Sequence, residues 1–183
     1  LLQLTEPFIC LWLGQEYVLP HIILILIIIN AFTGYTRGAT DQFLYGFGLF
    51  HDTWAPIVEV CISLTVALIG GSLWGLPGVL LGSIISQLSI VGVWKPYFLY
   101  SQGFKMPVLQ YWLGYIKHIL ILLLPGIACY YLFPSESFTP EKSFGHWIKY
   151  AMLTISTYSI ITLTMLYFFS NGMKLFIKRI MKK

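Results

Sequence analysis

The stretch that most constrains the fold of this chain is residues 52–97, which hold two apolar runs of about twenty residues, each long enough to cross a bilayer as a helix. A short turn joins the runs, and Pro56 and Pro77 lie near their starts, where a helix does not need the missing N–H group. Small residues recur every four positions in the second run, at Gly78, Gly82 and Ser86. The stretch predicts a transmembrane helical hairpin whose second helix packs its small face closely against protein.

The composition extends this prediction to the whole chain. The chain is 57% hydrophobic and only 10% charged, whereas about a quarter of the residues in soluble domains are charged. Apolar stretches long enough to cross a bilayer occur at about residues 18–50, 54–72, 76–95, 109–133 and 146–170. We therefore expect an all-α fold, a polytopic transmembrane helix bundle.

The two ends of the chain differ from these spans. Residues 1–17 have the character of the end of a preceding span followed by an outer loop, and this indicates the C-terminal portion of a longer protein. The formal net charge of +4 is concentrated in the tail, residues 171–183. Such a basic tail is typical of a cytoplasmic anchor beside anionic membrane lipids, so we expect no nucleic-acid partner.

A cytoplasmic tail fixes the orientation of the spans, because Lys and Arg concentrate on the cytoplasmic side of a membrane. Counting back from the tail, the loop at 134–145 lies outside and the loop at 95–105 lies inside. The inner loop 95–105 has two bases and no acid, whereas the outer segment 1–17 has two acids and no base. The charges of both segments agree with a cytoplasmic C-terminus.

A polar stripe runs along the first predicted span. Asn30, Arg37 and Asp41 lie on one face of this helix, together with Thr33 and Tyr45. Because polar groups are costly in lipid, the stripe is expected to face protein or water. Glu59, on the next and antiparallel helix, is predicted to lie close to the level of Asp41.

The sequence holds none of the motifs that are typical of membrane enzymes or metal centres. It lacks GxSxG, HExxH and a glycine-rich phosphate loop. Its three cysteines are isolated, without metal-ligand spacing, at Cys10, Cys61 and Cys129. We therefore expect no catalytic residue, no metal and no cofactor, and the polar stripe favours transport over catalysis.

Several motifs resemble one family of membrane proteins. These are DTWAPIVEV at 52–60, LWGLPGVLLGSIIS at 73–86 and VWKPYFLYSQGF at 93–104, preceded by PFICLWLGQEYVLP at 7–20. Over residues 1–105 the chain resembles the late part of bacterial polysaccharide biosynthesis proteins of the O-antigen flippase type. That family belongs to the multidrug/oligosaccharidyl-lipid/polysaccharide (MOP) exporter superfamily.

The resemblance implies a fold and a function. The fold is the C-terminal part of a MATE-like exporter, in which two helix bundles enclose a central cationic cavity and open alternately. The function is that of a flippase in the bacterial inner membrane, which moves lipid-linked oligosaccharide of the polyprenyl-pyrophosphate type for the synthesis of surface polysaccharide such as lipopolysaccharide O-antigen. Na⁺ or H⁺ is the coupling ion that such relatives use, and no ion site is assigned in this sequence.

Two interpretations of the polar residues stay open. In the functional one, Arg37 meets the pyrophosphate or an acidic sugar of the substrate, Asp41 and Glu59 hold it or exchange protons, and Asn30 completes the stripe. In the structural one, the same charges form an ion pair or reach the inner headgroups. Lys117 is either a further substrate contact or a lysine that reaches the inner interface.

Two alternatives to the flippase also stay open. The first is another exporter of the MOP superfamily, for drugs or for the peptidoglycan precursor. The second is a multispan enzyme, either a polysaccharide polymerase, which needs a large external loop, or an acyltransferase, which needs a catalytic His and an acid at one surface. His51 and Asp52 match that last requirement only superficially.

The predicted orientation can be tested by cysteine labelling. Single cysteines introduced at positions in 134–145 should react with an impermeant thiol reagent from the periplasm, because that loop is placed outside by the charge distribution. Cysteines introduced at positions in 101–105 should react only after the inner membrane is opened. The reverse pattern of labelling would contradict the orientation.

Overall fold

The computed structural model describes residues 1–181, except for the side chain at position 136. The described residues form helices joined by short connections, and no strand occurs among them. Five of these helices are long and apolar enough to cross a membrane: His21–Gly46, Trp54–Trp74, Leu76–Phe104, Leu109–Leu132 and Phe144–Phe169. The all-α prediction is confirmed, and the five helices agree with the prediction of a multi-pass membrane protein.

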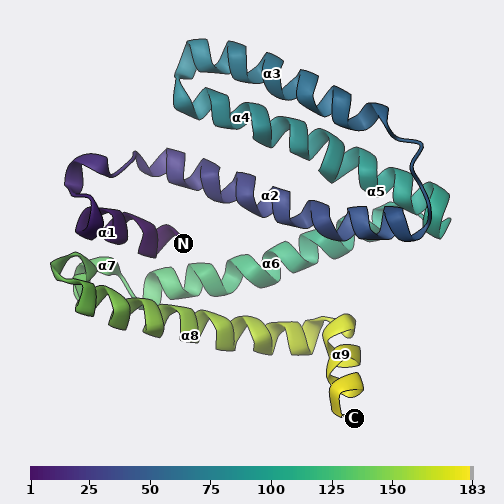
Figure 1. Cartoon of the computed structure of the whole chain (residues 1–183). Coiled ribbons are helices and arrows are strands. Elements are labelled where there is room, and N and C mark those ends of the chain that lie inside the picture. The colour runs from purple at the N-terminus through teal and green to yellow at the C-terminus, as the bar shows by residue number, and fades with distance from the viewer. Residues whose placement is uncertain (182–183) are drawn as a thin grey trace. The chain divides into compact units, whose positions relative to one another are not determined.

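The chain divides into two compact units, one formed by Leu19–Leu113 and the other by Leu1–Val18 with Gly114–Lys183. In the first unit, α2 (His21–Gly46) and α3 (Trp54–Trp74) are followed by α4 (Leu76–Gln87). The helix that begins with α4 continues through a π-helical segment (Leu88–Trp94), α5 (Lys95–Phe98) and a second π-helical segment (Leu99–Phe104). Figure 1 shows α3 and α4 side by side as a hairpin, next to α2.

The hairpin of α3 and α4 is held together by contact between backbones. Gly75 alone connects the two helices, and its φ of 65° belongs to the left-handed region that glycine adopts without strain. A Cβ atom added to Gly78 would lie 1.9 Å from the Gly70 carbonyl oxygen, so neither position has room for a side chain. Gly78, Gly82 and Ser86 are all buried. The predicted close packing of this small face against protein is confirmed.

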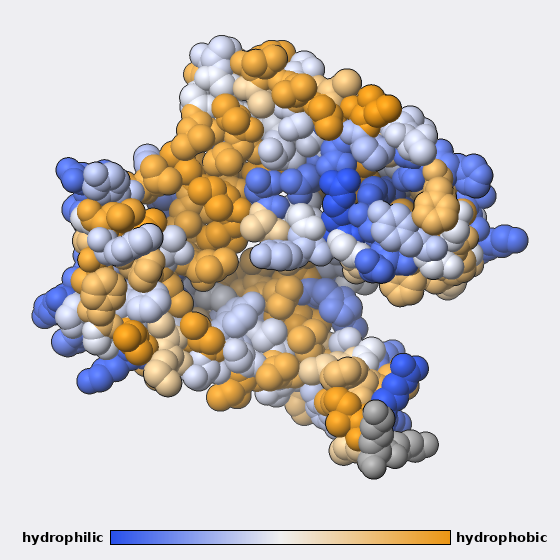
Figure 2. Space-filling view, viewed as in Figure 1, coloured by the Kyte–Doolittle hydropathy of each residue, from blue (hydrophilic) through white to orange (hydrophobic). Residues whose placement is uncertain are grey.

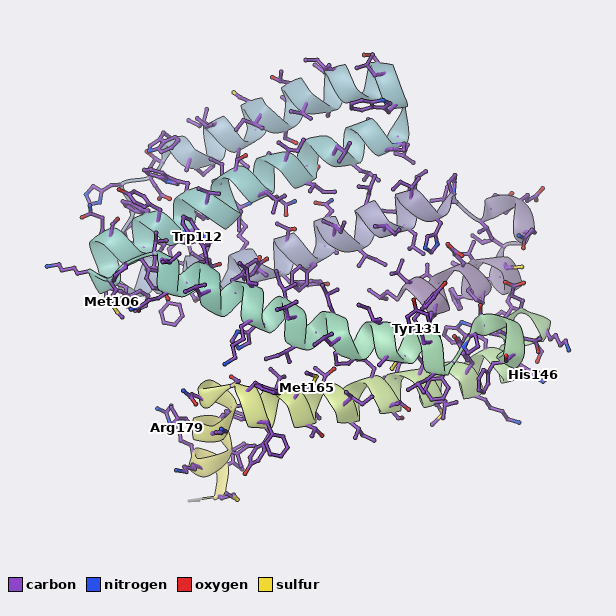
Figure 3. The ribbon with its side chains drawn as sticks, turned by 180° about the vertical axis from the view of Figure 1, so that it is seen from behind. Met106, Trp112, Tyr131, His146, Met165 and Arg179 are labelled. Atoms are coloured by element: carbon purple, nitrogen blue, oxygen red, sulfur yellow. The ribbon has the colours of Figure 1, made fainter. Side chains whose placement is uncertain are left out.

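The segment expected to be an inner loop, residues 95–105, is helical up to Phe104. Pro96 is the reason why the sequence suggests an end there, because it lacks the N–H that would bond to the Gly92 carbonyl in an α-helix. The indole Nε1 of Trp112 donates to that carbonyl instead, at 3.1 Å, from the start of α6 (Leu109–Leu132; Figure 3). The helix ends where Lys105 takes a left-handed conformation, with φ of 53°.

The second unit contains α1 (Leu2–Trp12), most of α6, α7 (Ser135–Phe138) and α8 (Phe144–Phe169). A 3₁₀ turn, Gln15–Tyr17, follows α1, and another, Pro140–Lys142, precedes α8. The Tyr150 hydroxyl donates to the Phe133 carbonyl at 2.8 Å, and the Trp147 indole donates to the Leu4 carbonyl at 3.0 Å. These bonds fix the first turns of α8 against the end of α6 and against α1.

The basic tail begins as an amphipathic helix, α9 (Asn171–Met181), and residues 182–183 of the tail lie outside the described residues. Its apolar side chains recur at helical spacing, at Met173, Phe176, Ile177 and Ile180. Lys174, Lys178 and Arg179 lie away from that stripe. A helix with this pattern suits the surface of a bilayer, and the anchoring of the tail beside anionic lipids stays a prediction.

The hairpin contact generates a stability prediction. Gly82→Leu should lower the amount of folded protein in the membrane, because a Cβ at this position would lie 2.7 Å from the Ser63 carbonyl oxygen. Gly38→Leu is the matched control, since a Cβ at Gly38 would meet nothing within 4 Å. Membrane abundance and thermal unfolding measure the effect, and equal stability of the two variants would contradict the packing.

Candidate functional site

The candidate site is a chain of four charged side chains contributed by α2, α3 and α5. Arg37 Nη1 donates to Glu59 Oε1 at 2.8 Å, and Arg37 Nε lies 3.5 Å from Asp41 Oδ2. The other carboxylate oxygen of Asp41 accepts a hydrogen bond from Lys95 Nζ. Two positive and two negative groups therefore alternate, and we call this set, Glu59, Arg37, Asp41 and Lys95, the charge cluster.

Helix geometry brings these residues together. Arg37 and Asp41 are one turn apart on α2, so their side chains share a face. Glu59 lies on α3, and Lys95 lies where the helix changes from one π-helical segment to α5. Such π-helical turns within α-helices are frequent at functional sites.

The charge cluster is largely shielded from solvent in the first unit. The side chain of Lys95 is 8% exposed, that of Glu59 12% and that of Asp41 19%, whereas Arg37 is 35% exposed. Burying a charge is costly unless it is paired, so the alternating order is what allows four ionised groups to lie among apolar helices. In the space-filling view, hydrophilic residues gather where α2 meets the hairpin (Figure 2).

A second polar contact lies on the same face of α2. Gln87 Nε2, near the end of α4, donates to Asn30 Oδ1 at 2.7 Å. Asn30 precedes Arg37 by two helical turns. The polar stripe of α2 therefore has polar partners at two heights, Gln87 at Asn30 and the charged groups of α3 and α5 two turns later. The expectation that this stripe faces protein or water agrees with these contacts.

The structure places four of the five residues proposed for substrate binding where α2 packs against the α3–α4 hairpin: Asn30, Arg37, Asp41 and Glu59. The fifth, Lys117, is exposed and lies in the part of α6 that belongs to the other unit. Its role as a substrate contact stays a prediction.

Sequence reasoning missed Lys95 and Gln87. From the sequence, Lys95 lies at the boundary between the expected span 76–95 and the expected inner loop 95–105. No local sequence pattern indicates that the helix continues past it; in the structure Phe104 contacts Phe43 and Phe47 near the end of α2, at ring-centroid distances of 5.7 and 5.1 Å. Gln87 follows the small residue Ser86, and an amide within so apolar a run was itself a signal for a polar partner.

A pocket of about 280 Å³ opens beside the charge cluster within the same unit. Its lining residues come from α2, α3 and α4: Arg37, Pro56, Glu59, Val60, Ser63, Ser83, Ser86 and Gln87. Glu59 Oε2 and Gln87 Oε1 are buried and have no hydrogen-bond partner in the described protein. Two of the side chains that line the pocket therefore each carry an oxygen without a partner in the described protein.

Metal binding is not indicated by the described residues, since no three of their His, Cys, Asp or Glu side chains are grouped so that they could hold an ion. The chemistry that the charge cluster offers is charge-assisted hydrogen bonding.

The pairing of Lys95 with Asp41 can be tested by substitution. Asp41→Asn should destabilise the protein by about 3 kcal/mol or more, because it removes the counter-charge of a buried ammonium group. The double variant Asp41→Asn with Lys95→Met should recover much of that loss, since both charges are then removed together. Asp52→Asn, in the connection before α3, is the matched control. Thermal unfolding of the full-length protein is the measurement, and a double variant no more stable than Asp41→Asn would refute the pairing.

Comparisons with protein-family models, with curated proteins and with solved structures find no match for this chain. The chemistry of the site itself consists of four mutually compensated charges and a polar pocket, within helices long and apolar enough to cross a membrane.

Proposed function

We propose that this chain is part of a flippase that moves lipid-linked oligosaccharide across the bacterial inner membrane, as a member of the MOP exporter superfamily. The observation that carries the proposal is the charge cluster with its adjacent pocket, held by helices that are long and apolar enough to span a bilayer. Ionisable groups inside a membrane are costly and usually mark the path of a substrate or an ion.

The described connections between the helices favour transport over an enzyme. One residue joins α3 to α4, and four residues, 105–108, separate the helix ending at Phe104 from α6. A polymerase would need a large external loop, and no described connection provides one. His51 and Asp52 lie in the connection before α3, without any motif of an acyltransferase around them.

The pairing of Arg37 constrains how the charge cluster acts in this function. Its guanidinium already contacts two carboxylates, from Glu59 and Asp41, so a pyrophosphate that binds Arg37 has to share its single positive charge with them or exchange places with one of them. Such an exchange of one ion pair for another gives little net affinity. Weak binding suits a transporter, because a substrate that enters the path must also leave it.

Complementation with Arg37 variants tests the proposed function. Surface-polysaccharide display should be restored in a flippase-deficient strain by the full-length protein, impaired with Arg37→Lys and abolished with Arg37→Ala. A lysine is a point charge that cannot contact two carboxylates with the fork geometry of arginine. Membrane abundance of each variant is the control. Full display with Arg37→Ala would remove Arg37 from the path, and no display with the unsubstituted protein would contradict the flippase function.

A further inference from the structure

The pocket beside the charge cluster contains two hydrogen-bond acceptors that the protein leaves unpaired. Glu59 uses Oε1 to accept from Arg37, while its Oε2 is buried without a partner. Gln87 uses Nε2 to donate to Asn30, while its Oε1 is buried without a partner. Both side chains line one pocket, so a ligand in it lies against two side chains that each carry an acceptor without a partner in the described protein.

The charges around the pocket disfavour an anion. The guanidinium of Arg37 is compensated by Glu59 and Asp41, and the ammonium group of Lys95 by Asp41. An anion in the pocket would therefore meet the free carboxylate oxygen of Glu59 without an uncompensated cation to offset it. A neutral donor meets no such repulsion.

The rest of the lining suits a carbohydrate. Ser63, Ser83 and Ser86 contribute hydroxyl groups, which both donate and accept hydrogen bonds. Pro56 and Val60 contribute apolar surface, against which the C–H groups of a sugar ring can pack. This combination of acceptors, hydroxyls and an apolar wall is that of a site for a neutral, polyhydroxylated ligand.

We propose that this pocket binds hydroxyl groups of a neutral sugar, and that the sugar is the carbohydrate part of a lipid-linked substrate. The second half of this assignment depends on the proposed flippase function. The first half depends only on the pocket. The pyrophosphate of the substrate is not the group that the pocket holds.

Two amphiphiles with the same alkyl chain test the assignment. The full-length protein in lipid nanodiscs is titrated with decyl glucoside, whose headgroup is a neutral sugar, and with decyl phosphate, whose headgroup is an anion. Decyl glucoside should bind more tightly than decyl phosphate. Free glucose is a third probe, expected to bind more weakly than decyl glucoside, and equal binding would overturn the assignment to a lipid-linked sugar.

Two substitutions separate the pocket from a general effect on folding. Glu59→Gln keeps one oxygen for Arg37 but turns the free acceptor into an amide donor, so decyl glucoside should bind about tenfold more weakly and decyl phosphate more tightly. Gln87→Leu removes an acceptor without a change of charge, so it should weaken decyl glucoside binding without any gain for decyl phosphate. Unfolding would weaken the binding of both probes, and would not weaken decyl glucoside while strengthening decyl phosphate as expected for Glu59→Gln.

Thr65→Ala is the matched control, because Thr65 lies on α3 with Glu59 but is exposed and donates its hydroxyl to the Cys61 carbonyl. Its affinities for both probes should equal those of the unsubstituted protein. Tighter binding of decyl phosphate than of decyl glucoside by the unsubstituted protein would overturn the sugar site. Unchanged glucoside affinity in both pocket variants would overturn it as well.

The test distinguishes failure of this assignment from failure of the flippase proposal. If the full-length protein restores polysaccharide display but does not bind decyl glucoside, the sugar site is wrong while the transport function stands. If it binds decyl glucoside and the pocket variants respond as expected but display is not restored, the sugar site stands and the transport function is wrong.

Discussion

The arrangement of α2, α3 and α5 depends on one requirement, that a charge among apolar helices must have a partner. Lys95 is the most buried member of the charge cluster, and it is tolerated because Asp41 accepts its hydrogen bond. Asp41 in turn contacts Arg37, and Arg37 contacts Glu59 on the neighbouring helix. Since each group compensates the next, these ion pairs hold α2, α3 and α5 at fixed positions relative to one another.

The close approach of α3 and α4 positions this network. Because Gly70 and Gly78 bring the two backbones into direct contact, residues further along each helix also lie near one another. Glu59 and Ser63 of α3 thereby line the same pocket as Ser83, Ser86 and Gln87 of α4. A stripe of small residues thus does more than join two helices, since it also sets the width of a polar pocket.

The sequence predicted the hairpin and the polar stripe because both depend on periodic patterns within single helices. The every-fourth spacing of small residues from Gly78 to Ser86, and the spacing from Asn30 to Asp41, determine which side chains share a face. Where a helix ends depends on contacts between helices, and a local sequence pattern does not predict those contacts. Lys95 is misplaced for that reason, because the donor that pairs the Gly92 carbonyl in place of the N–H that Pro96 lacks is Trp112, on a later helix.

The partners of the polar stripe likewise cannot all be predicted from the pattern of residues within one helix. Glu59 could be placed near Asp41 by counting turns from a shared connection, because the two helices are consecutive and antiparallel. Gln87 reaches Asn30 from α4, which packs against α3 through glycines, and the pocket is lined by residues of three helices. Which atoms are left unpaired is therefore a property of the assembled helices alone.

The balance of charges in the cluster has a consequence for how the protein responds to voltage. Moving one elementary charge across a membrane at 100 mV involves about 2.3 kcal/mol. Two positive and two negative groups that move together carry no net charge through that field. As far as these four residues are concerned, a conformational change that translates the intact charge cluster without rotating it is insensitive to the membrane potential, whereas one that separates Lys95 from Asp41 along the membrane normal is not.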